Sequence, residues 1–503
     1  MDLTANPEDE SRGLAEKWKT EIRLYEHQAD KWHERSKKIL KRYKDERNNA
    51  QETKAQFNIF WSNIQTLLPS VYGNAPKPNV TRRFTDKDDV GRLASEILER
   101  SVTYFIQENH FTNSMKQSVF DYLTTGRGTA WVRYVPHLRD VESPEITNSE
   151  EPIDIPGEVP EPAQEVYYEE VVTDYVHWSD FGHTIARTPS EIRAVWRIVY
   201  LDRDELNERF GEEIGTKIPL DYSPKDLKDA KIAEDLKKAS VYEIWDKASK
   251  QAIWVHKDFP EPLDRLDDPL KIKNFFPCPM PMLANLANDT CIPTPDYTQY
   301  QDQANELDQL TGRIHSIQKS LKVAGVYDSS AKGVERLLTE GVQNQLIPVD
   351  QWAVFSEKGG LKGVINLLPL QEIASSLEMI YQVRDKVKAD LYEISGISDI
   401  MRGISDPDET ATGQTLKGQY SSIRLKDKQE EVARFARDIV VIMIEVIAAH
   451  FSVDTLKKIS GVKLLTNQEK MQAQMLLAPP HPPMQQPVPM QPQMPQPQMM
   501  GAR

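Results

Sequence analysis

Two long helical patterns joined by a glycine-rich turn constrain the fold of this chain more than any other stretch. They predict one helix over residues 371–393 and a second from about residue 415 to 450. Residues 395–414 contain Pro407 and three glycines, which argue against a continuous helix. Short oxygen-bearing side chains there can cap the second helix, namely Asp406, Asp408, Thr410 and Thr412. We therefore expect an elbow between two rods, shaped by Gly403, Thr410, Thr412 and Gly413.

A third long helix is predicted over residues 295–323, where Pro295 precedes the helical pattern. Its apolar residues recur every three or four positions, in the series Ala304, Leu307, Leu310, Ile314, Ile317 and Leu321. At 1.5 Å per residue such a helix is about 40 Å long. The seam suits packing beside another helix. Periodicity alone leaves open whether this is an ordinary core helix or a helix that lines a channel.

The N-terminal region is strongly helical and basic. Residues 1–12 are polar and acidic, and we expect no fixed structure there. From residue 13 to about 54, apolar residues such as Trp18, Ile22 and Tyr25 repeat at helical spacing. The same stretch carries many cations, which fit either a solvated helix face or a surface that meets DNA or an acidic neighbour: Arg23, Lys31, Arg35, Lys37, Lys38, Lys41, Arg42 and Lys44.

Residues 57–176 read as helices followed by a β-hairpin. Helices are predicted over 57–68 and 86–122, with a short strand over 79–84 between them. The turn Gly126-Arg127-Gly128 leads into a strand, where glycine supplies backbone angles that other residues resist. The hairpin strands are predicted over 129–135 and 166–176. Between them, residues 141–170 hold ten acidic residues and no basic one, which favours an exposed loop at the hairpin tip.

The next stretch alternates strands and turns. Residues 194–200 form a good strand, followed by a short helix with Asp202 or Asp204 as its cap and Gly211 as its stop. Residues 241–246 and 251–256 alternate like a second hairpin about the turn 247–250. Proline-rich sequence follows at residues 277–281.

Residues 324–369 are mixed in character. Short strands are predicted near 346–349 and 352–355, with a helix over 334–340. The glycine-rich segment 356–363 carries Lys358 and Lys362, which could contact phosphate or belong to a plain surface turn; it lacks the P-loop motif. Beyond residue 451, helices are predicted over 453–465 and 467–477. The Pro/Gln/Met-rich residues 478–503 predict no fixed fold.

Composition and motifs exclude several functional classes. The 503-residue chain has a net charge of −15, so any nucleic-acid contact must be local. It has no apolar run long enough to span a membrane and no signal-peptide pattern, which favours a cytosolic origin. Cys278 and Cys291 show no metal-ligand spacing, and no catalytic motif or cofactor motif is present. The acidic residues of the elbow could suggest a two-metal nuclease, although capping explains them better: Asp399, Asp406, Asp408 and Glu409.

The elbow resembles the portal, or head-to-tail connector, proteins of tailed bacteriophages of the short-tailed type. The matching residues are Ile397, Ile400, Gly403, Asp406, Thr410, Ala411, Thr412, Ser421, Lys426 and Glu430. The resemblance covers roughly residues 14–460 and implies a mixed α+β, helix-rich portal fold that assembles as a ring. It implies this division: 1–12, disordered N-terminus; 13–235, first part of the wing; 236–294, clip; 295–323, stem helix; 324–369, second part of the wing, with a channel loop at 356–363; 370–451, long wing and crown helices; 452–477, C-terminal crown helices; 478–503, disordered tail.

The same resemblance implies a structural function without catalysis or cofactors. Twelve copies would form a channel at one capsid vertex of the virion, after synthesis in the host cytoplasm. The implied partners are other copies, the major capsid protein, the terminase large subunit, head-tail adaptor or tail proteins and double-stranded DNA, with no membrane. Candidate DNA contacts are Lys358, Lys362, Arg313 and Lys319. The alternatives are a nucleic-acid-processing enzyme, such as a terminase or nuclease, and a helical scaffold or adaptor.

Overall fold

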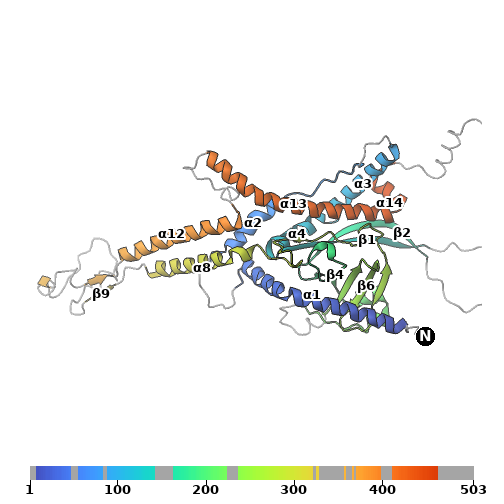
Figure 1. The fold of residues 1–503 in the computed structure, drawn as a ribbon, viewed down its shortest axis with the longest axis horizontal. Coiled ribbons are helices and arrows are strands. Elements are labelled where there is room, and N and C mark those ends of the chain that lie inside the picture. The colour runs from blue at the N-terminus through green and yellow to red at the C-terminus, as the bar shows by residue number, and fades with distance from the viewer. Residues whose placement is uncertain are drawn as a thin grey trace, which may run out of the picture.

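The chain folds as a mixed α+β protein in which a body of sheets and helices carries one long helical projection (Figure 1). The computed structural model describes residues 7–46, 55–82, 88–141, 163–223, 236–320, 325–327, 356–357, 365–367, 370–397 and 411–462. The hairpin loop 142–162, the C-terminal residues 463–503 and most of 321–369 therefore lie outside the described residues, together with the predictions made for them.

One side of the body is a five-stranded antiparallel sheet covered by the N-terminal helix. The sheet has the order β3-β4-β5-β6-β7, with β3 at Phe181–His183, β4 at Ala194–Leu201, β5 at Ala239–Asp246, β6 at Gln251–His256 and β7 at Asp264–Asp267. Helix α1, Pro7–Tyr43, lays its apolar face on this sheet, where Trp18, Ile22 and Tyr25 pack with Trp196 and Ile253. The helical periodicity predicted this face, but the helix begins at Pro7, inside the stretch expected to lack structure.

The second hairpin and the capped helix confirm two local predictions. Strands β5 and β6 pair in register from Val241–His256 to Asp246–Gln251, and Lys250 closes the turn with φ of 53°. Helix α5, Arg203–Phe210, begins with a reciprocal capping box between Asp202 and Glu205 and ends at Gly211. The 3₁₀ turn η1, Pro189–Glu191, precedes β4, and the short α6, Glu212–Gly215, follows α5. A small cluster that includes Leu206 and Val241 joins α5 to the sheet.

The main core lies between the first hairpin and the helices around it. Strands β1, Arg127–Val141, and β2, Ala163–Val176, pair from Thr129–Val176 to Val141–Ala163, and β8, Met282–Leu283, extends their sheet. Helix α4, Phe111–Thr124, packs on both long strands, and α2, Ile59–Val71, packs on α4. Helices α3, Asp89–Glu108, α13, Ala411–His450, and α14, Val453–Ser460, cover the outside (Figure 1).

One prediction for residues 79–122 is wrong, because residues 79–82 form no strand. The helical stretch predicted over 86–122 consists of two helices, α3 and α4. The break between them lies at Asn109 and His110, where His110 takes a left-handed conformation with φ of 53°. The Asn109 side-chain amide donates to the Val171 carbonyl at 3.0 Å, so a contact with β2 holds the bend.

A buried polar cluster joins α4 to the two sheets. The Asp121 carboxylate accepts from the Tyr175 hydroxyl and from the Trp178 backbone N–H, both through one oxygen. Burial raises the pKa of Asp121 from 3.8 to about 7, although both hydrogen bonds oppose the shift. Burial also lowers the pKa of the neighbouring His183 to about 4.

We expect Asp121→Asn to change the pH dependence of stability. Asp121 binds its proton more tightly in the folded chain, so its ionisation lowers the free energy of unfolding as pH rises from about 4 to 7. An asparagine oxygen can accept the same two hydrogen bonds without ionising. The stability of the variant relative to the unmodified chain should rise across this window, by at most about 4 kcal/mol. Denaturant unfolding between these pH values measures the difference, and a constant difference would contradict the assignment.

Candidate functional site

The projection is an antiparallel pair of long helices, α8 at Tyr297–Ser320 and α12 at Leu370–Ser395 (Figure 1). The predicted seam on α8 forms their contact, because Ala304, Leu307, Leu310 and Ile314 are buried. Near the outer end of the pair, the Gln318 amide donates to the Tyr381 hydroxyl at 2.9 Å. Strands β9, Gly325–Tyr327, and β10, Ile365–Leu367, pair with each other beyond that end. The structure thus pairs the helix that was expected to form the stem with α12, which the sequence analysis assigned to another region.

The root of the projection is fixed to the body by Asp308. Its carboxylate forms an ion pair with the Arg42 guanidinium at 2.8 Å and accepts a hydrogen bond from the Phe57 backbone N–H at 2.8 Å. Arg42 lies in the last turn of α1, and Phe57 precedes α2. The charge pair is largely shielded from solvent, which strengthens it relative to a surface pair. One carboxylate therefore joins α8 to the two helices at its base.

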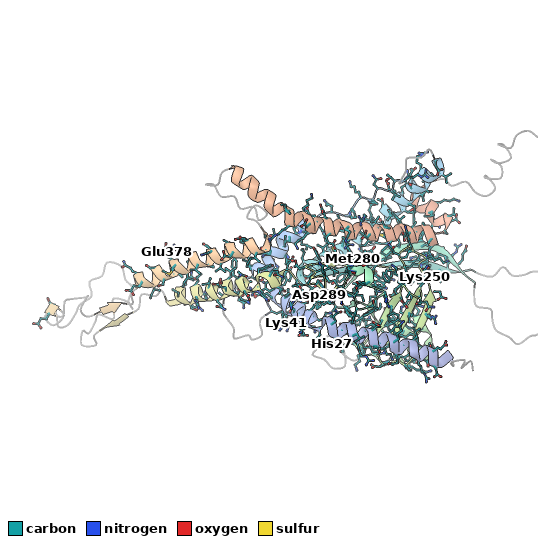
Figure 2. All side chains as sticks on the ribbon, in the orientation of Figure 1. His27, Lys41, Lys250, Met280, Asp289 and Glu378 are labelled. Atoms are coloured by element: carbon teal, nitrogen blue, oxygen red, sulfur yellow. The ribbon has the colours of Figure 1, made fainter. Side chains whose placement is uncertain are left out.

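Much of the surface of α12 is exposed in the part of the chain that the structure describes. Among its described side chains only Val387 and Leu391 are buried, although the helix has 26 residues. Met379 is 65% exposed and Val383 is 42% exposed, one helical turn apart on the same side. Figure 2 labels Glu378 on this helix, in the projection outside the body. A helix this exposed gains little from burial in the isolated chain.

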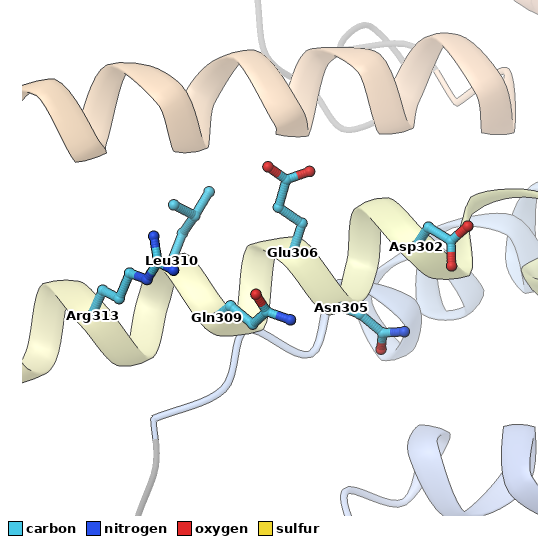
Figure 3. Close-up of a pocket in the computed structure, with 6 residues that line it drawn as sticks. All are labelled: Asp302, Asn305, Glu306, Gln309, Leu310 and Arg313. Atoms are coloured by element: carbon cyan, nitrogen blue, oxygen red, sulfur yellow. The ribbon is translucent and has the colours of Figure 1, made fainter.

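A shallow depression of about 470 Å³ follows α8 beside its packed seam (Figure 3). Its lining carries both signs of charge and one apolar side chain: Asp302, Asn305, Glu306, Gln309, Leu310 and Arg313. Figure 3 shows Glu306 directed toward the neighbouring helix. The mixed lining fits contact with a polar protein surface better than an enclosed small-molecule site.

The candidate DNA contacts do not form one patch in the described structure. Arg313 and Lys319 are both exposed, and among the described residues neither forms an ion pair. They are six positions apart on α8, so they point to sides of the helix that differ by about 120°. Lys358 and Lys362 lie outside the described residues.

The elbow is shorter than the sequence indicated. Helix α13 begins at Ala411, so Thr412 and Gly413 lie in its first turn instead of in the turn before it, while Gly403 and Thr410 lie outside the described residues. A glycine inside a helix costs only about 1 kcal/mol, and Gly413 is therefore a weak boundary signal.

An arginine that the sequence analysis missed ties the end of α12 to α13. Gly396 closes α12 with φ of 71°, and its N–H donates to the Tyr392 carbonyl at 2.9 Å. The Arg424 guanidinium donates to the Ile394 carbonyl at 2.9 Å. A cation near the last carbonyls of a helix is favourable. No local pattern could have identified Arg424, because its partner lies 30 residues earlier in the chain.

Residues 236–294, which the resemblance assigned to the clip, lie in the body of the chain. Residues 236–294 contribute β5, β6 and β7 to the five-stranded sheet and β8 to the hairpin sheet. Their side chains belong to the body's cores, where Ile244 and Ile253 pack against α1 and Met282 packs in the main core. The alternating sequence pattern predicted β5 and β6 correctly, but it did not predict the other strands beside which they lie in the sheet.

The described residues show no arrangement that would hold a metal. Within them, no group of three or more His, Cys, Asp or Glu side chains is placed to bind one. Cys278 and Cys291 are buried and unpaired, and burial raises the pKa of both thiols. The four acidic residues considered as a two-metal site all lie outside the described residues.

Comparisons with known proteins give no family for the chain. No protein-family model matches it, and a search of curated proteins found no match either. In the part of the chain that the structure describes, no helix combines the length and apolar character that a membrane crossing needs.

Proposed function

We propose that this chain is a phage portal subunit that closes into a ring of about twelve copies. The observation that carries the proposal is the exposed projection: a helix pair extends from the body, and the outer side of α12 leaves Met379 and Val383 in solvent. Neighbouring copies would cover that side. Each apolar side chain buried at such a contact contributes up to about 1.5–3 kcal/mol, and the contribution recurs at every interface of the ring.

The helix pair supports a revised division of the proposed ring subunit. Both α8 and α12 would form the stem, instead of α8 alone. Helix α8 ends and helix α12 begins at the outer end of the pair, where β9 and β10 lie. We therefore assign the docking of terminase and head-tail adaptor proteins to that end, and the contact with the major capsid protein to the body.

The net charge supports a channel through which DNA slides. At −15 per chain, twelve copies would carry a formal charge of about −180. Such a ring repels phosphates over most of its length, so double-stranded DNA would pass without tight binding. Exposed cations such as Arg313 and Lys319 would supply local contacts whose strength falls with added salt.

Native mass spectrometry tests this proposal directly. The purified full-length chain of 57.6 kDa is expected to give a closed assembly of about twelve copies at micromolar concentration. Images of the particle should show a ring with a central channel. Single chains at every concentration tested, or turnover of nucleotide or DNA by the purified protein, would contradict it.

A further inference from the structure

The second half of α1 presents a line of cations to solvent on a strongly acidic protein. We define the α1 basic stripe as Lys31, Arg35, Lys38 and Lys41. These positions lie three or four residues apart, so their side chains share one side of the helix. That side differs from the buried face of α1, where Trp32 packs with the cluster of the five-stranded sheet and Ile39 packs in the main core. Figure 2 labels Lys41 and His27 along this helix.

The four cations of the stripe are free to meet an external anion. All four are exposed, and among the described residues none forms an ion pair. The neighbouring charges of α1 are already paired: Lys37 with Glu34, Arg42 with Asp308 and Lys44 with Glu46. Residues 31–44 hold seven lysines and arginines and a single acidic residue. The field at this end of α1 is therefore positive, although the chain as a whole is negative.

The composition of the stripe distinguishes between polyanions. No large apolar side chain is exposed between Lys31 and Glu46. Protein interfaces usually bury an apolar centre, and single-stranded nucleic acids usually stack on aromatic rings. The stripe offers neither feature, since Trp32 is buried in the opposite face of the helix. What remains is a straight row of positive charges about 15 Å long.

We propose that the α1 basic stripe binds the phosphate backbone of double-stranded DNA without sequence preference. A duplex presents one phosphate per about 1.7 Å of axis, so a row of this length faces several phosphates at once. The stripe lies on the body and not on the projection, so the contact would be additional to any DNA inside a channel. It requires neither ring closure nor the portal assignment.

Salt-dependent binding of a labelled mixed-sequence duplex tests the inference. Four phosphate contacts predict a slope of log affinity against log salt of about −3.6, which is roughly a 100-fold loss between 50 and 200 mM. The double variant Lys38→Ala/Lys41→Ala should make this slope shallower by about 1.8. The matched control is Arg12→Ala/Arg23→Ala on the first half of the same helix, where Arg12 pairs with Glu261 and Arg23 lies 4.0 Å from Glu16.

The two double variants remove equal charge from one helix, so a nonspecific effect of net charge would change both slopes alike. That result would overturn the inference, as would a slope unchanged by Lys38→Ala/Lys41→Ala. Poly-glutamate that binds the stripe as tightly as the duplex would indicate an acidic-protein surface and would also overturn it. Loss of duplex binding by the stripe variant alone supports it, whether the protein is a ring or a single chain.

Discussion

Arg127→Met is expected to lower the free energy of unfolding by about 3–5 kcal/mol, because it removes three buried hydrogen bonds from a charged donor. The guanidinium is fully buried. It donates to the carbonyls of Trp178 and Phe181 at 2.6 and 2.7 Å and to the Tyr25 hydroxyl, and it lies 4.4 Å from the centre of the Trp32 ring. Methionine fills similar space but removes all three hydrogen bonds. The Phe181 carbonyl then keeps only the Tyr25 hydroxyl, at 3.4 Å, and each buried oxygen left without a donor costs about 1–3 kcal/mol.

Arg139→Met is the matched control for this substitution. Arg139 lies on the same strand, is largely exposed and pairs with Glu165 at 2.9 Å. Exposed ion pairs contribute about 0–1 kcal/mol, so this variant should unfold almost as the unmodified chain does. Denaturant unfolding of both variants at neutral pH measures the contrast. We call Arg127 and its hydrogen-bond partners Tyr25, Trp178 and Phe181 the Arg127 cluster. An equal loss of stability in both variants would show that this cluster does not hold α1 to the hairpin.

The Arg127 cluster also shows where sequence reasoning stops. The turn at Gly126 was predictable, and Gly126 has φ of 89°. No local sequence pattern indicated the role of Arg127, because its hydrogen-bond partners lie between 51 and 102 residues away in the chain. The need for glycine at position 128 could not be inferred from the sequence either. Gly128 is needed for space, because a β-carbon there would collide with the Ser118 carbonyl of α4. Backbone preference can be inferred locally, whereas close approach depends on the packing of distant elements.

Elements whose signal lies within a few neighbouring residues were predicted well. The α5 cap, the β5–β6 turn and the apolar face of α1 depend on such signals. The arrangement of the long helices does not depend on such local signals. An apolar seam on α8 predicts a partner helix, but only the fold shows that α12 is that partner and that both leave the body. Exposure of Met379 and Val383 is likewise a property of the fold, because apolar residues at helical spacing look alike in a core and on an unpartnered side.

Met379→Asp/Val383→Asp is expected to abolish the proposed ring while leaving the single chain folded. Met379 is 65% exposed and Val383 42% exposed in the isolated subunit, and neither is a buried core residue, so the substitutions remove few internal contacts. At an interface between copies, the two lost apolar contacts amount to about 3 kcal/mol, or roughly a 100-fold weaker contact. A desolvated carboxylate adds a further cost. Native mass spectrometry should therefore detect single chains where the unmodified protein forms rings.

The control for assembly makes the same chemical change away from the projection. Leu24→Asp/Ile185→Asp replaces two apolar side chains that are 47% and 50% exposed on the body. If the outer side of α12 is the contact between copies, this control should still form rings. Both double variants should keep a cooperative unfolding transition, and the variant without rings should unfold at a somewhat lower denaturant concentration because it lacks the stabilisation by assembly. Rings that survive Met379→Asp/Val383→Asp would remove α12 from the interface. A variant that also loses its unfolding transition would instead show that these side chains stabilise the subunit itself, because burial between copies changes assembly without changing the stability of a lone chain.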